Sequence, residues 1–224
     1  MNKPAENEIL LNEAQTPDTI ETASFAIIEE EIPEPRPFSG HAWQVARRII
    51  HAAGDITILA DLVLPDASVQ AGITALAGGA SIFTDTEMAK AGIPLRRITP
   101  LGCKVECVLS MNGLEHTAME HGITRTRAGF LTLGSRLAGS IVVIGNAPTA
   151  LLAVLDHVKA GGSPPALVIG MPVGFVNAAE SKALLERNND INYLTLRGRR
   201  GGSALAAAAV NALAEILLQF PDRS

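Results

Sequence analysis

The sequence predicts an α/β protein: a single three-layer α/β/α domain built around a mostly parallel sheet. Short runs rich in Val, Ile and Leu recur along the chain, with little alternation of apolar and polar residues, as in strands buried on both faces. Stretches with the helical spacing of apolar residues separate these runs. The 224 residues, of which 47% are hydrophobic, are enough to bury the core of such a domain.

The N-terminal part of the chain differs from the rest in charge. Residues 1–36 hold nine acidic and two basic residues, a sum of −7, so the total of −5 leaves +2 for the other 188 residues. Residues 1–16 are polar and acidic and lack apolar periodicity, as disordered segments do. We therefore expect a disordered leader over 1–16 and one domain over 17–224.

The individual elements follow from apolar runs and from the residues that interrupt them. A first helix includes Ser24 and is capped by Thr19 or Thr22, and three prolines between positions 33 and 37 then form a connector. A second helix runs from Ser39 to a stop at Gly54. The predicted strands are 56–64, 81–83, 105–109, 141–144, 166–169 and 193–196. The other predicted helices are 66–77, 85–91, 114–121, 124–137, 147–159, 178–187 and 203–218.

Composition argues against several classes of function. No apolar run reaches the length of a membrane-spanning helix and the first residues do not form a secretory signal, so we expect no membrane partner. The acidic pI of about 5.5 argues against a nucleic-acid partner. Cys103 and Cys107 suit neither a disulfide framework nor a four-ligand zinc site, which indicates a protein of the reducing cytoplasm. We interpret them as buried structural thiols rather than metal ligands.

Three turns between a predicted strand and the next helix are candidate ligand sites, because ligands of open α/β sheets bind at the carboxyl ends of strands. The first turn contains Gly145 and Asn146 and precedes a proline suited to the start of a helix, whose free N–H groups favour an anion. The second turn is 170–175. Each of these two, taken alone, is more often an ordinary tight turn. None of the three turns matches a nucleotide-binding fingerprint.

The third turn, residues 197–203, carries Arg197, Arg199 and Arg200 among glycines. Guanidinium groups beside glycines that permit close backbone approach form a cradle for a carboxylate or phosphate. A solvated basic loop is the alternative, and we favour the anion site. The charge of +2 on the body of the chain is compatible with a small anionic ligand.

Two ionisable residues in other segments need an interpretation. His51 ends the apolar stripe of the second helix and is flanked by Arg47 and Arg48. A histidine in this position suits a proton donor or acceptor, and a helix-capping or core histidine fits the same pattern. Asp85 is expected to cap the helix that follows it.

The motifs taken together resemble the precorrin-8X methylmutase family, also called cobalt-precorrin-8 methylmutase, of cobalamin biosynthesis. The resemblance extends from about residue 20 to residue 218. It rests on SFAII at 24–28, RIIHAAG at 48–54, DTEM at 85–88, RLAGS at 136–140, IGNAPTA at 144–150, GMPVGFV at 170–176, AESK at 179–182 and RGRRGGS at 197–203.

This resemblance implies an isomerase that moves a methyl group from C-11 to C-12 of a contracted tetrapyrrole ring and needs no cofactor. The product is hydrogenobyrinate or its cobalt counterpart, cobyrinate. The resemblance also implies a homodimer that holds the substrate near the subunit interface.

The resemblance assigns roles to particular residues of this chain. His51 is the catalytic histidine and acts as a general acid toward the ring. Substrate contacts fall on Ser24, Arg48 and Arg125, with Arg127 as the alternative to Arg125. The anionic, carboxylate-edged ring would find further contacts at the first and third turns: Gly145, Asn146, Arg197, Arg199 and Arg200.

Two functions of other classes stay open on the sequence. One is a phosphate- or nucleotide-using α/β enzyme, against which the missing P-loop lysine and dinucleotide fingerprint count. The other is a tetrapyrrole carrier without catalytic activity. The sequence also does not distinguish a metal-free substrate from one that contains cobalt.

Overall fold

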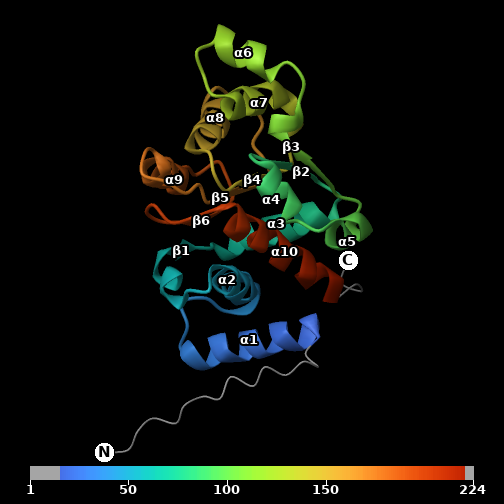
Figure 1. The fold of residues 1–224 in the computed structure, drawn as a ribbon, viewed down its shortest axis with the longest axis vertical. Coiled ribbons are helices and arrows are strands. Elements are labelled where there is room, and N and C mark those ends of the chain that lie inside the picture. Colours follow the sequence, from blue (N-terminus) through green and yellow to red (C-terminus); the bar gives the residue numbers. More distant parts are fainter. Residues whose placement is uncertain (1–15, 220–224) are drawn as a thin grey trace, which may run out of the picture.

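The computed structural model describes residues 16–219 and has the layered α/β architecture that the sequence predicts (Figure 1). One sheet has the strand order β1-β6-β5-β4-β2-β3. β1 pairs antiparallel with β6, and the other neighbouring strands pair in parallel, so the mostly parallel sheet is confirmed. The strands are β1 (Leu62–Val63), β2 (Ser81–Thr84), β3 (Lys104–Cys107), β4 (Ile141–Ile144), β5 (Leu167–Gly170) and β6 (Tyr193–Leu196).

Helices cover both faces of this sheet. The α-helices are α1 (Pro17–Glu31), α2 (Gly40–Ala53), α3 (Asp66–Ala77), α4 (Glu87–Ala91), α5 (Leu95–Ile98), α6 (Leu114–Glu120), α7 (Arg125–Leu133), α8 (Pro148–Lys159), α9 (Ala178–Glu186) and α10 (Ser203–Gln219). The 3₁₀ helices are η1 (Ile56–Asp61), η2 (Thr99–Leu101), η3 (Val108–Ser110) and η4 (Gly134–Leu137). The predicted leader over 1–16 lies outside the described residues except for Thr16, and the domain limits of 17–224 stay a prediction.

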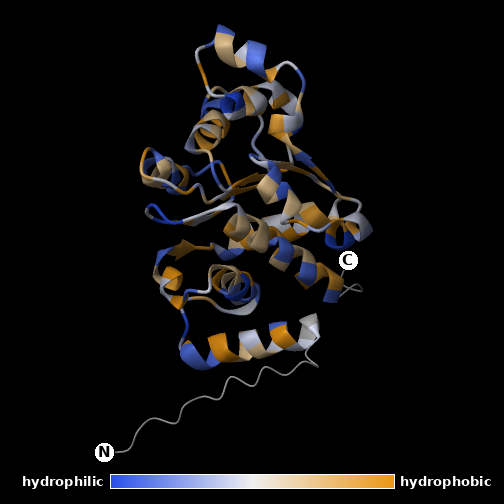
Figure 2. Ribbon diagram, viewed as in Figure 1, coloured by the Kyte–Doolittle hydropathy of each residue, from blue (hydrophilic) through white to orange (hydrophobic). Residues whose placement is uncertain are grey.

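Side chains of successive strand residues enter two separate cores. Along β4, Ile141 and Val143 belong to the core covered by α2, α3 and α10, whereas Val142 and Ile144 belong to the core covered by α7, α8 and α9. Both faces of the strand are therefore apolar, which explains the absence of alternation in the sequence. Figure 2 shows the apolar colours gathered in the central strands, while outer helices such as α1 and α6 carry both colours.

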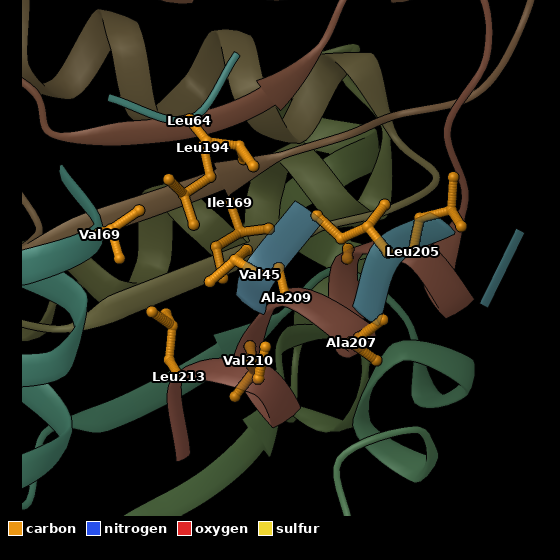
Figure 3. Close-up of a cluster of buried hydrophobic side chains, with 14 of the residues drawn as sticks. Val45, Leu64, Val69, Ile169, Leu194, Leu205, Ala207, Ala209, Val210 and Leu213 are labelled. Carbon is orange, nitrogen blue, oxygen red and sulfur yellow. The ribbon is translucent and has the colours of Figure 1, made fainter. Parts of the chain in front are cut away.

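The alanine-rich helix α10 packs against the sheet and against α2. Small side chains such as Ala207 and Ala209 let its backbone approach these neighbours closely, and Val210 and Leu213 fill the space beside them (Figure 3). Val45 of α2 lies in the same cluster. The alanines thus have a packing role, as we expect of an alanine-rich helix that keeps an apolar face.

The structure contains α5, η2 and η3, which the sequence does not predict, and it differs from the prediction in three further segments. Most of the predicted strand 56–64 is the 3₁₀ helix η1, because the Asp55 carboxylate accepts the N–H of Thr57 at 2.8 Å and begins a helical turn there. The predicted helix 124–137 becomes 3₁₀ after Leu133. The predicted caps of the first helix are also wrong, since the cap of α1 is Thr16, followed by a proline in the first turn.

Candidate functional site

His51 lies in the last turn of α2, which Gly54 ends in the left-handed conformation with φ of 61°. The half-buried imidazole meets the ring of Phe25 edge-on, with ring centroids 5.5 Å apart and an angle of 71° between the planes. It borders a hollow of about 350 Å³, here called the His51 hollow, which Ser24 and Ile28 of α1 also line. The structure thus brings Ser24 and His51 to the same hollow.

A second hollow lies on the other side of the end of α2. This Ala53 hollow of about 380 Å³ is lined by Ala53 and Val173 and by residues 200–202, 204 and 205. Asp55 borders both hollows. Hydrogen bonds from Thr57 hold the pKa of Asp55 below its usual value, so this residue is a carboxylate at neutral pH. The end of α2 therefore separates two adjacent, largely apolar hollows with one charged group between them.

The predicted arginine cradle is only partly open to a ligand. Arg197 pairs with Glu186 of α9 at 3.0 Å. Arg200 pairs with Asp55 at 3.1 Å and with Asp61 at 2.5 Å. Within residues 16–219 the exposed Arg199 has no carboxylate partner, and its Cζ lies 5.2 Å from the centroid of the Phe175 ring. One of the three guanidinium groups is therefore free to bind an external carboxylate.

Arg48 lies beneath α1 and is buried, with an exposure of 7%. Its guanidinium group forms ion pairs with Glu21 of α1 and with Glu215 of α10. The hydrogen bond from Arg48 is the main cause of a lowered pKa at Glu21. Arg48 stacks on Phe25 with its Cζ 4.9 Å from the ring centroid, and it lines a different hollow from His51. Its charge is already balanced within the chain.

Arg125 lies far from these residues in one chain. It is the first residue of α7, which covers the sheet face opposite to α2 (Figure 1). Its exposed guanidinium group pairs with Glu115 at 3.3 Å. The alternative, Arg127, pairs with Asp156 at 2.7 Å. Neither arginine lines a hollow with His51.

The turn at Gly145 and Asn146 already holds an anion, and this anion is the carboxylate of Asp85. The Asp85 oxygens accept the N–H groups of Gly145, Asn146 and Ala147 at 3.1, 2.7 and 2.8 Å. The prediction that Asp85 caps the following helix is wrong, because Thr86 caps α4. Burial raises the pKa of Asp85 and the three N–H groups oppose that change. The backbone donors proposed for the substrate are therefore engaged within the chain.

Lys182 has no functional role in the sequence-based predictions, and the structure buries it completely. Its Nζ donates to the backbone carbonyl of Arg200 at 2.6 Å. A signal exists in the sequence, since Ala178, Ser181, Lys182 and Leu185 have the i, i+3, i+4, i+7 spacing of one buried helix face. A lysine on such a face is rare without a specific reason.

Three further observations on the described part concern metal ligands, thiols and membrane-spanning helices. Within residues 16–219, no group of three or more His, Cys, Asp or Glu side chains is arranged to hold a metal ion. Cys103 and Cys107 are free and buried, and burial raises the pKa of both thiols. No helix in this part is long and apolar enough to cross a membrane.

Comparison with known proteins identifies the family. The model of the precorrin-8X methylmutase family matches residues 19–216. The chain belongs to the precorrin-8X methylmutase family. Precorrin-8X methylmutase of Pseudomonas aeruginosa is 45% identical over 172 residues, which cover 76% of this chain and 82% of the relative. Cobalt-precorrin-8 methylmutase of Leptospira interrogans is 39% identical over 201 residues, with coverages of 87% and 91%.

A solved structure supports the same assignment. Precorrin-8X methyl mutase from Thermus thermophilus superposes with a TM-score of 0.82 at 36% identity, covering 89% of this chain and 98% of the other. As a member of the methylmutase family, the chain is an isomerase of cobalamin biosynthesis that catalyses a methyl migration. The resemblance stated from the motifs is confirmed, and the nucleotide-using enzyme and the non-catalytic carrier are set aside.

Proposed function

We propose that this methylmutase moves the methyl group from C-11 to C-12 of precorrin-8X, with His51 as the general acid. The observation that carries the proposal is the setting of His51. Its imidazole is half-buried at the end of a helix, is held edge-on by Phe25 and borders an apolar hollow with Ser24. A proton donor placed in this way can act on one atom of a large apolar ring.

The bond that forms and the bond that breaks in the methyl shift both belong to the substrate. In our proposal His51 protonates or hydrogen-bonds a ring nitrogen, which shifts the conjugation of the ring so that the migration becomes favourable. A positioned general acid contributes about 10²–10⁴-fold in rate. The rest of the acceleration comes from holding the ring in one tautomer and one shape.

The substrate is larger than either hollow. Volumes of about 350 and 380 Å³ lie at the low end for small-molecule sites, and a tetrapyrrole edged by carboxylates exceeds them. We place the ring across the end of α2, over the His51 hollow and the Ala53 hollow. Arg199 beside the Ala53 hollow would then bind a peripheral carboxylate, and Ser24 would contact the ring beside His51.

A homodimer explains why one predicted contact lies on the opposite side of the sheet. His51 belongs to the helical layer of α2, and Arg125 belongs to the layer of α7. A second subunit would bring the partner subunit's Arg125 to the ring that His51 acts on. Large apolar side chains that are exposed in one chain support a covering partner: Phe175 is 81% exposed, Val176 77% and Met119 83%.

The names of the relatives bear on whether the natural ring contains cobalt. The relative that is 45% identical bears the name of the metal-free substrate, and the one that is 39% identical bears that of the cobalt substrate. This order favours precorrin-8X, and the ratio of rates on the two rings tests it. A cytoplasmic location stays a prediction from the cysteine content.

Turnover by a histidine variant tests the proposed chemistry. The variant His51→Ala should convert precorrin-8X to hydrogenobyrinate about 10²–10⁴-fold more slowly, as followed by visible absorption, because the general acid is lost. Its affinity for hydrogenobyrinate should stay near that of the wild type. His41→Ala, an exposed histidine of the same helix, is the control and should keep full activity. A near-normal rate in His51→Ala would contradict the role of His51.

A further inference from the structure

Lys182 of α9 has no part in the proposed chemistry, yet its position is specific. Its side chain is completely buried, and within residues 16–219 its ammonium group has no carboxylate partner. The hydrogen bond to the carbonyl of Arg200, at 2.6 Å, is its polar contact. The carboxylate of Asp61 attracts this charge from beyond ion-pair distance, and the cost of burial still outweighs that attraction. An apolar side chain of similar size would avoid the cost. Stability alone therefore does not explain a lysine here.

The carbonyl that Lys182 binds belongs to residues 197–202, here called the arginine segment. Three backbone hydrogen bonds hold this segment. The amide of Gly174 donates to the carbonyl of Arg199 at 3.1 Å, and the amide of Gly202 donates to the carbonyl of Met171 at 2.9 Å. The amide of Arg197 donates to the carbonyl of Asp61 at 2.8 Å. Lys182 adds a fourth bond, from α9, at the residue next to Arg199. The segment is thus fixed by the turn after β5, by the end of η1 and by α9.

A fixed backbone matters here because of the side chain that it carries. Arg199 is exposed beside Phe175 and has no carboxylate partner among the described residues, unlike Arg197 and Arg200. A free guanidinium group on a rigid backbone binds a carboxylate with a smaller loss of entropy than one on a mobile loop. The bond from Lys182 lies one residue from Arg199.

We propose that Lys182 is a positioning residue that holds the arginine segment so that Arg199 meets a carboxylate of the tetrapyrrole. This inference rests on the proposed function, because it takes Arg199 as a substrate contact. Lys182 itself is too deeply buried to touch the ring. Its effect is therefore expected on the binding of substrate, through Arg199, and not on the chemical step at His51.

Steady-state kinetics on precorrin-8X test the inference with Lys182→Met, which keeps the length of the side chain and removes the donor. We expect KM to rise about tenfold, the loss of about 1.4 kcal/mol of binding, while kcat stays within about twofold. Lys159→Met removes an exposed lysine of α8 and should leave both constants unchanged. A folded Lys182→Met enzyme with the KM of the wild type would overturn the proposal.

A double-mutant cycle with Arg199→Ala separates positioning from a general loss of structure. If Lys182 acts through Arg199, Lys182→Met should raise KM in the wild type but by less than about twofold in Arg199→Ala. Equal factors in the two backgrounds would overturn the proposal. If Lys182→Met does not fold, Lys182→Arg replaces it in the cycle, and the change in KM is again compared between the wild-type and Arg199→Ala backgrounds. If the wild type does not convert precorrin-8X, the proposed function is wrong. The same four proteins are then compared by their affinity for hydrogenobyrinate.

Discussion

At the scale of one residue, Asp85 shows that an anion site predicted from a motif can be occupied by a side chain of the same chain. The motif at Gly145 and Asn146 predicts an anion at the start of a helix, and the structure has an anion there. That anion is Asp85, which lies 60 residues away along the chain. The N–H donors can be predicted from the residues around Gly145. The acceptor, Asp85, cannot be predicted in this way, because its position depends on how β2 and β4 pair in the sheet.

We predict that Asp85→Asn lowers the free energy of unfolding by about 1–3 kcal/mol, because an amide loses the charge that strengthens these bonds and points an N–H group at other donors. Chemical denaturation measures the loss. Asp190→Asn is the matched control, because this aspartate is exposed and its carboxylate has no ion pair or hydrogen bond within residues 16–219, and it should change stability by less than about 0.5 kcal/mol. Equal stability of the two variants would contradict the role of Asp85.

Lys182 gives a pH dependence whose sign follows from its surroundings. Burial lowers the pKa of Lys182 from 10.5 to about 8. Between these two values the folded protein holds fewer protons than the unfolded chain, so the free energy of unfolding rises with pH in this window. Below about pH 8 the buried charge costs its full amount, and this cost disappears as pH rises toward 10.5.

The measurement compares the wild type with Lys182→Met by urea denaturation between pH 7 and pH 10.5. The free energy of unfolding of the wild type should gain up to about 3 kcal/mol relative to the variant across this range. The contributions of other titrating groups cancel because both proteins share them. A difference between the two proteins that does not change with pH would show that Lys182 titrates normally.

At the scale of elements, the predicted and observed bounds agree where residues within an element or next to it determine its structure. Helix α3 and strand β4 have the predicted bounds, because glycine, proline and uniform apolar runs mark their ends. The apolar run before Pro65 also has the pattern of a strand, and most of it forms η1, which begins where the Asp55 carboxylate accepts a hydrogen bond from the Thr57 amide. Periodicity in a short run cannot resolve this choice.

Helix α1 is the element whose role the sequence shows least. It lies outside the three layers and packs against α2 (Figure 1). Glu21 and Glu29 pair with Arg48 and Arg47 of α2, and Phe25 lies between these arginines and His51. Docking of α1 therefore places both Ser24 and the Phe25 ring that packs against His51.

We predict that Glu21→Gln loosens α1 without unfolding the layers beneath it. The buried Arg48 keeps one carboxylate and loses the other, so local opening of α1 should become easier by about 1–3 kcal/mol. Hydrogen exchange of α1 amides measures this effect, with the exposed Glu30→Gln as the control. Because the pKa of Glu21 is lowered, acid should loosen the wild-type helix as pH falls through that pKa. Equal protection in both variants would contradict this account.

At the scale of the whole molecule, the sequence suggests an acidic N-terminal part that is separate from a basic body, and the structure joins the two. The acidic N-terminal part does not stand apart from the basic body, since Glu21 and Glu29 neutralise arginines of α2. Within residues 16–219, the arginines without a carboxylate partner are Arg96, Arg187 and Arg199. Recognition of a polycarboxylate by one subunit therefore depends on few open guanidinium groups, which is a further reason to expect a second subunit at the site.

We propose that each active site combines His51 of one subunit with the partner subunit's Arg125. Mixing His51→Ala with Arg125→Ala chains, each nearly inactive alone, tests it through subunit exchange. Random pairing makes half of the dimers mixed, and each mixed dimer has one intact site of two, so activity should recover to about one quarter of the wild type. If the mixture stays as inactive as its two components after exchange, the two residues do not serve one site across an interface.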